Sequence, residues 1–169
     1  MNSTPVNATW AVGQMDGADV RLRSAQGSGL MDLDVTAPVR AGQLRLAGDD
    51  LHLDLTIALD KIKTGNFLTE HAARAFIAGY RAHDLVYAGS GSRKASAANI
   101  TGPAKAGSID VDIQLLVTPI GDGWHSMSEI EIAGNAGFGR VHIPIPGVGT
   151  VDDLVVDIDA RLLVSEMDS

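Results

Sequence analysis

The clearest structural pattern in the sequence is a nine-residue stretch in which every odd position is apolar: Leu51-His-Leu-Asp-Leu-Thr-Ile-Ala-Leu59. Successive side chains of a β-strand point to opposite faces, so an alternation with period two predicts a strand with one apolar face. His52 and Asp54 fall on the other face, where we expect water. The stretch therefore predicts a strand with a hydrophobic core on one side only.

The same alternation continues outward from this stretch along the rest of the chain. It recurs in Ile109–Val117 and, with even positions apolar, in Leu154–Val164. Shorter alternating pieces are Trp10–Val12, Ala18–Arg23, Leu30–Thr36, Gln43–Ala47, Leu85–Gly89, Ser128–Ala133 and Arg140–Ile145. Turn-forming residues predict the breaks at Gly13, Gly27–Gly29, Pro38, Gly48–Asp50, Gly102-Pro103, Gly121–Gly123 and Pro146-Gly147. Many short strands of this kind predict a sandwich or a closed barrel.

A single segment follows a different period. Between Phe67 and Tyr80 the apolar residues are spaced by four, which predicts one helix starting near Asn66. We find no internal repeat or linker, so we expect one domain over residues 1–169, with its core at about 10–164. The predicted fold is an all-β, eight-stranded antiparallel barrel with this one helix, wide enough for one small ligand.

Charge and composition exclude several partners. The formal net charge is −8 and the isoelectric point is about 4.9, so we expect no binding to nucleic acid, whose phosphates such a surface repels. The chain has no cysteine, which excludes disulfides and thiolate metal sites. Its first residues show neither a basic region nor an apolar run, and no apolar stretch reaches transmembrane length. We therefore expect a cytoplasmic protein without an integral membrane segment.

The pairs of polar residues offer little chemistry. Each lies on the polar phase of a predicted strand: His52 with Asp54, Asp110 with Asp112, Glu129 with Glu131, and Asp157 with Asp159. Paired carboxylates serve acid–base catalysis when they converge in a cleft, but these positions predict an outer wall in water. No H-x-H or H-E-x-x-H spacing occurs. We predict no catalytic residue, no metal site and no cofactor.

Several short motifs follow one another in a defined order. They are Trp10-Ala-Val12, the strand Leu55–Ile62 running into Lys63-Thr-Gly-Asn66, Ile100-Thr-Gly-Pro-Ala-Lys105, Gly137-Phe-Gly139 and the closing strand Val151–Asp159. Together they resemble the W-x-I-D, D-T-G-N, I-x-G-x-x-R/K, D-F-G and G-D-x-V-x-I-x-I-x motifs of the YceI-like lipid-binding family, with Lys63 and Gly137 each in place of Asp. The resemblance extends from about Trp10 to Val164. It departs after the predicted helix, where Phe76–Leu85 lacks the proline and some of the aromatics of the family's F-F-D and Y-P.

The resemblance implies more than the alternation does. It implies a lipocalin-like barrel, a tunnel for a polyisoprenoid or fatty chain, and often a homodimer; members are often secreted or periplasmic. Residues on the apolar strand phases, with one from the helix, are expected to bind the ligand: Leu53, Leu55, Ile57, Phe76, Ile113, Leu115, Val156, Ile158 and Leu162. Ala160 shares their phase, and we expect Ala160→Trp to block the tunnel.

Three functions remain open at this point. The first is a carrier or sequestering protein for a long apolar ligand, because each buried CH₂ contributes about 0.8 kcal/mol without any polar anchor. The second is a small barrel enzyme, a cyclase or isomerase acting on a flexible apolar substrate, which His52 or Glu131 turned inward would favour. The third is a ligand-free structural module for dimerisation, which a filled interior would favour.

Overall fold

The computed structural model describes residues 7–13, 19–24, 34–63, 78, 81, 83–94, 96–121, 123–124, 127–143 and 149–167. Within these residues the chain forms nine strands and one 3₁₀ turn. They are β1 (Asn7–Val12), β2 (Asp19–Ser24), β3 (Asp34–Ala47), β4 (Asp50–Ala58), η1 (Leu59–Lys61), β5 (Asp84–Arg93), β6 (Ala98–Ala106), β7 (Ile109–Gly121), β8 (Met127–Ile143) and β9 (Gly149–Glu166).

The strands form one closed antiparallel barrel. From β3 to β9 each strand pairs with the next along the chain, and β9 returns to pair with β1 and β2. These two short strands share one place in the wall, because both lie between β9 and β3 and both run antiparallel to them. The wall therefore has eight strand positions, as the alternation predicts.

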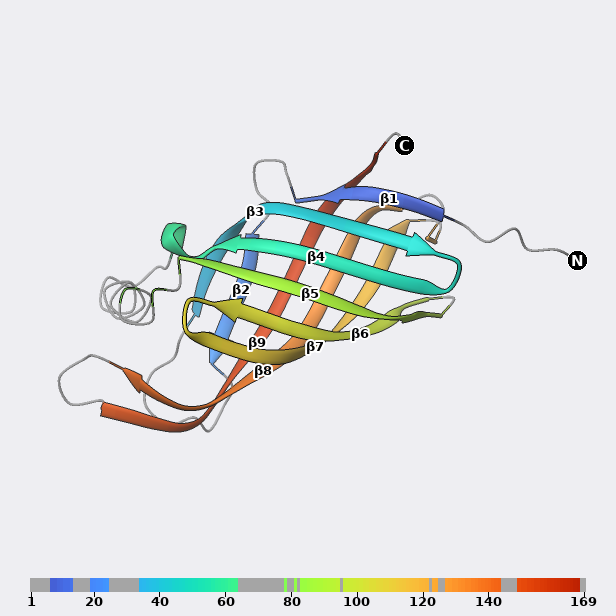
Figure 1. Cartoon of the computed structure of the whole chain (residues 1–169). Coiled ribbons are helices and arrows are strands. Elements are labelled where there is room, and N and C mark those ends of the chain that lie inside the picture. The colour runs from blue at the N-terminus through green and yellow to red at the C-terminus, as the bar shows by residue number, and fades with distance from the viewer. Residues whose placement is uncertain are drawn as a thin grey trace, which may run out of the picture.

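The two ends of the barrel differ (Figure 1). At one end β1 begins and β9 finishes, and we call it the terminal end; the opposite end, where β4 runs into η1, we call the η1 end. Within the wall, β1 lies toward the terminal end and β2 toward the η1 end, since Val12 faces Val164 on β9 while Val20 faces Ala160. β1 therefore connects β9 to β3 at the terminal end, and β2 connects them at the η1 end.

Two of the predicted breaks are wrong. Pro38 lies inside β3, opposite Asp19, and a bulge between Val39 and Ala41 lets this long strand bend and continue. Gly102-Pro103 lies inside β6, where the pairing with β5 skips from Tyr87↔Ala104 to Ser90↔Thr101. Proline has no N–H to donate, so it is tolerated where a ladder bond is absent.

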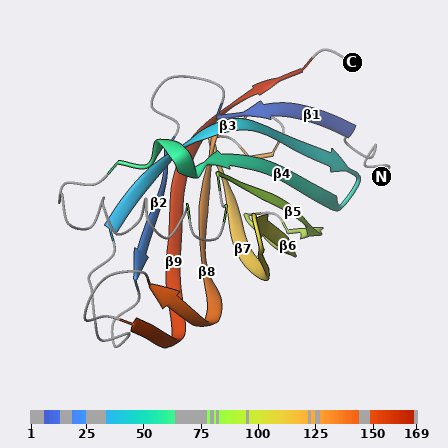
Figure 2. The same cartoon turned by 60° about the vertical axis from the view of Figure 1, so that its left-hand side comes forward.

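The β8–β9 hairpin is longer than the rest of the wall. β7 and β8 pair only from Gln114↔Asn135 to Gly121↔Met127, whereas β8 and β9 stay paired as far as Ile143↔Gly149. Bulges interrupt β8 between Gly137 and Gly139 and again before Val141. In both views this hairpin bends away from β7 (Figures 1 and 2).

The terminal half of the barrel is a filled core. Eight side chains there have no exposed surface: Val12, Leu44, Leu51, Leu53, Ile100, Val117, Ile130 and Leu162. Trp10 and Trp124 are buried at this end, and Trp124 Nε1 donates a hydrogen bond of 2.9 Å to Lys94 O. Arg93 Nε donates to Gly48 O at 3.0 Å, so the end of β5 is bonded to the turn between β3 and β4. This end is therefore closed by packing and by backbone-directed bonds.

The predicted helix over Phe67–Tyr80 falls, except for Ala78, outside the described residues, and Phe76 falls there too. No helix in the described part of the chain is long and apolar enough to span a membrane.

Candidate functional site: an apolar pocket at the η1 end

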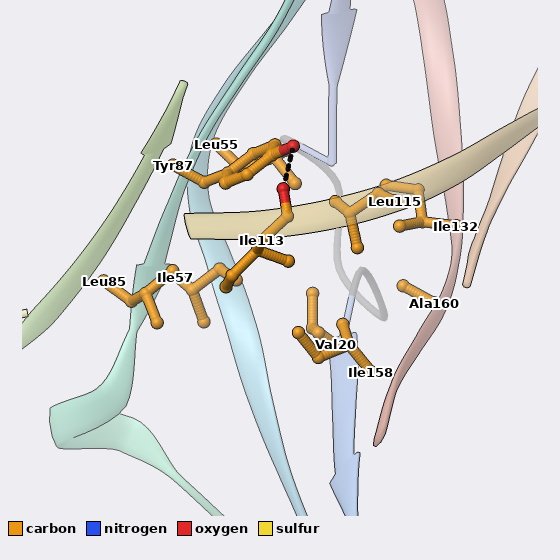
Figure 3. Close-up of a pocket in the computed structure, with 10 residues that line it drawn as sticks. All are labelled: Val20, Leu55, Ile57, Leu85, Tyr87, Ile113, Leu115, Ile132, Ile158 and Ala160. Carbon is orange, nitrogen blue, oxygen red and sulfur yellow. Dashed lines mark hydrogen bonds between the residues drawn. The ribbon is translucent and has the colours of Figure 1, made fainter. Parts of the chain in front are cut away.

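A pocket lies inside the barrel on the side of the filled core that faces the η1 end. Six strands contribute its ten lining residues: Val20, Leu55, Ile57, Leu85, Tyr87, Ile113, Leu115, Ile132, Ile158 and Ala160. Their side chains surround a common space in Figure 3. The inner surface is wholly apolar, so the pocket suits hydrocarbon and offers no charge or free hydrogen-bonding group.

The pocket is narrow. Its cavity volume is about 20 Å³, which is room for roughly one water molecule. An apolar cavity of this size gives water no hydrogen-bond partner, so hydrocarbon is its better occupant. A chain of several carbons enters only when the Leu and Ile side chains of the lining change rotamer.

Tyr87 carries the one polar side-chain atom among the ten lining residues. Its side chain is 2% exposed, and its hydroxyl donates a hydrogen bond of 3.1 Å to Ile113 O on β7. Burial raises the pKa of Tyr87 to about 12, because the low-dielectric surroundings disfavour the phenolate. The hydroxyl is thus neutral and already engaged, and the ring presents its carbon edge and face to the pocket.

An ionic frame holds the wall at the η1 end. Arg40 on β3 donates from Nη2 to Asp60 Oδ1 at 2.9 Å and from Nε to Asp84 Oδ1 at 3.0 Å. Asp60 N donates to His83 O, and Thr36 pairs with Lys63. The side chains of Arg40, Asp60 and Asp84 are each about 40% exposed, so these bonds fix the geometry of the rim more than they add stability.

The paired carboxylates lie on the outer face, away from the pocket. Arg23 on β2 forms an ion pair of 3.4 Å with Asp159, and Arg161 forms one of 2.6 Å with Glu129. Asp110, Asp112 and Glu131 are exposed. The described residues include no group of three or more His, Asp or Glu that could hold a metal ion.

Five of the nine predicted ligand-binding residues meet in the pocket: Leu55, Ile57, Ile113, Leu115 and Ile158. Leu53, Val156 and Leu162 are buried but lie outside its lining. Phe76 is outside the described residues. Parity along a strand predicts which residues point inward, but it does not tell how far along the barrel each one lies.

Sequence reasoning missed four lining residues: Val20, Leu85, Tyr87 and Ile132. Each sits in a short alternating piece and pairs across strands with a neighbour on the same side, as Tyr87 does with Leu55 and Ile132 with Ala160. The signal was present in the alternation of Leu85 with Tyr87. Recognising it requires the register between β4 and β5, which the sequence does not state.

The fold and the pocket define a class: small closed antiparallel β-barrels with an apolar cavity toward one end. A solved structure with a similar fold is the crystal structure of BcnA from Burkholderia cenocepacia, which matches with a TM-score of 0.54 over 88% of this chain and 96% of that chain. The two sequences are 12% identical, so the likeness shows a shared fold alone. No family model and no curated protein matches the sequence.

Proposed function

We propose that this barrel binds a single apolar, chain-bearing molecule in the pocket and acts as a lipocalin-like carrier or sequestering protein. The observation that carries the proposal is the lining of ten residues without a charged or free polar group, enclosed in a closed wall. The ligand class, a polyisoprenoid or fatty-chain lipid, rests on the sequence resemblance to YceI-like proteins.

Affinity for such a ligand comes from desolvation alone. Each methylene transferred from water to the pocket contributes about 0.8 kcal/mol, and the widening of a tight lining subtracts from that gain. Unbranched or methyl-branched chains suit this space better than ring systems, because they thread between Leu and Ile side chains with small rotamer changes. We therefore expect a slender ligand and a pocket that widens as it fills.

Native mass spectrometry of the purified protein, followed by solvent extraction and identification of the extract, tests the proposal. We expect a bound mass that is released by the solvent and that belongs to a hydrocarbon-rich molecule. The protein stripped of ligand should then take up N-phenyl-1-naphthylamine with a rise in fluorescence. A stripped protein that binds neither this dye nor any straight-chain alcohol would contradict the proposal.

The small free volume favours a second candidate, a structural barrel without ligand. A filled terminal half and about 20 Å³ of free space are what a packed interior looks like. The uptake measurement separates the two, because a structural barrel shows no dye binding at any concentration at which it stays folded. The enzyme alternative has no comparable support, since Glu131 is exposed and His52 occupies the outward phase of β4.

We also propose that the protein is a homodimer, a property that the resemblance implies. Light scattering at micromolar concentration tests this. A mass of about twice the 17.6 kDa of one chain is expected, and a monomer at that concentration would remove the claim.

A further inference from the structure

Tyr87 lies flat against the inside of the wall. A Cβ atom at Gly89, two residues further along β5, would overlap the Tyr87 hydroxyl and come within 2.7 Å of ring atom Cε2. The ring therefore covers Gly89, and it extends from β5 past β6 to reach Ile113 O on β7. The contact with Gly89 and the hydrogen bond to Ile113 O both involve the hydroxyl end of the side chain, and together they hold the ring in this position.

The ring borders the pocket on the β5 side, next to residues of the filled core. Residue 89 is one alternation nearer the terminal end than Tyr87, and it faces Leu53, which is fully buried. Close to them on the same side are Leu44, opposite Leu53, and Ile100, opposite Gly91, and neither is exposed. In Figure 3 Tyr87 and Leu55 lie together on one side of the pocket, across from Val20 and Ile158. A chain that enters from the η1 end thus meets this ring.

Gly89 leaves the space above it on the inner wall to the Tyr87 ring. Because residue 89 has no side chain, the space over it on the inner wall is filled by the Tyr87 ring and by nothing from its own strand. Shortening Tyr87 therefore leaves an empty volume continuous with the pocket, whereas shortening Leu53 would leave a hole beyond the ring.

From this geometry we propose that Tyr87 is the stop of the pocket and sets the longest apolar chain that the barrel accepts. This inference rests on the proposed function and deepens it. The chain binds tail first, because the Tyr87 hydroxyl already donates to Ile113 O and the stop offers only carbon to the ligand. The polar head of the ligand stays at the η1 end, where Arg40, Asp60 and Asp84 lie at the rim.

A series of straight-chain primary alcohols, competing against N-phenyl-1-naphthylamine, measures the limit. In the wild type, affinity should rise about fourfold for each added methylene until the chain reaches the ring, and then stop rising. In Tyr87→Val the rise should continue for several more carbons. Tyr87→Phe keeps the ring and should keep the wild-type limit. Leu85→Ala, on the same strand and face but nearer the η1 end, should change affinity without moving the limit.

The outcomes distinguish this inference from the function on which it rests. If the wild type binds alcohols and Tyr87→Val has the same length limit, the stop is elsewhere while ligand binding stands. If Tyr87→Phe moves the limit as far as Tyr87→Val, a steric stop is refuted. If the wild type binds no alcohol, the proposed function itself fails. Tyr87→Leu, which keeps more of the buried carbon, makes the same comparison should Tyr87→Val melt too low for the assay.

Discussion

Ala160→Trp replaces the smallest side chain of the pocket lining with the largest natural side chain. Ala160 is 7% exposed, belongs to the pocket lining and pairs with Val20 on β2 and Ile132 on β8. The free space of about 20 Å³ cannot hold an indole, so the lining must move, at an overpacking cost of about 1–3 kcal/mol. If the indole displaces about four methylenes of ligand, binding weakens by about 3 kcal/mol, or about 200-fold.

Urea unfolding and dye titration together check this expectation. Ala133→Trp is the matched control, because Ala133 is exposed on the outer face of β8, in direct register with Asp159, the neighbour of Ala160 in sequence. The control should retain wild-type dye affinity and nearly wild-type stability. The reasoning is refuted if Ala160→Trp is folded, by the same circular dichroism spectrum as the control, and still binds N-phenyl-1-naphthylamine as tightly as the wild type does.

Three further predictions concern the terminal end, the ionisation of Tyr87 and the packing of β5 against β6. Trp124→Phe removes the bond to the Lys94 carbonyl and should lower the free energy of unfolding by about 1 kcal/mol in urea, without affecting dye uptake at the opposite end. The pKa of Tyr87 is 10.0 in the unfolded chain and about 12 in the folded one, so its contribution to stability is constant below pH 10 and falls by about 1.4 kcal/mol per pH unit between pH 10 and pH 12. The difference in unfolding free energy between wild type and Tyr87→Phe should therefore change only above pH 10; a flat difference to pH 12 would contradict the raised pKa. Gly102→Ala forces a Cβ into a neighbouring backbone carbonyl and should cost more than about 2 kcal/mol, whereas Gly137→Ala meets open space and should cost under 1 kcal/mol. Equal melting temperatures for these two alanine variants would argue against the close approach of β5 and β6.

The sequence predicts most of the wall because alternation is a local signal. β4, β7 and the C-terminal part of β9 are visible as alternating stretches, and the phase of each tells which residues face inward. A charged residue on the wrong face would lose several kcal/mol of solvation, so the phase and the register agree. Closure into a barrel is one of the ways in which such a sheet can protect its edges, and the alternation alone does not distinguish it from a sandwich.

The ends of the strands and the depth of the pocket are beyond local reasoning. Pro38 and Pro103 carry the same signal as a turn, yet both lie in strands where a bulge or a skipped pair makes their missing N–H harmless. Tyr87 is placed in the pocket by its pairing with Leu55 and by the absence of a side chain at Gly89. These features depend on how neighbouring strands pair, and the alternation within a single strand does not reveal that pairing.

The shared place of β1 and β2 in the wall has a consequence for how the barrel forms. From β3 to β9 each strand pairs with the next along the chain, but the pairs of β9 with β1 and β2 join the two ends of the chain, as at Val12 with Val164 and Val20 with Ala160. Closing a loop of that length carries the largest entropy cost of any pairing in the barrel. This seam, made of two six-residue strands, should therefore form last during folding, and its amides should exchange with solvent deuterium before those of β4 to β7. The unfolding rate of the native barrel is then set by the rate at which the pairs of β9 with β1 and β2 open.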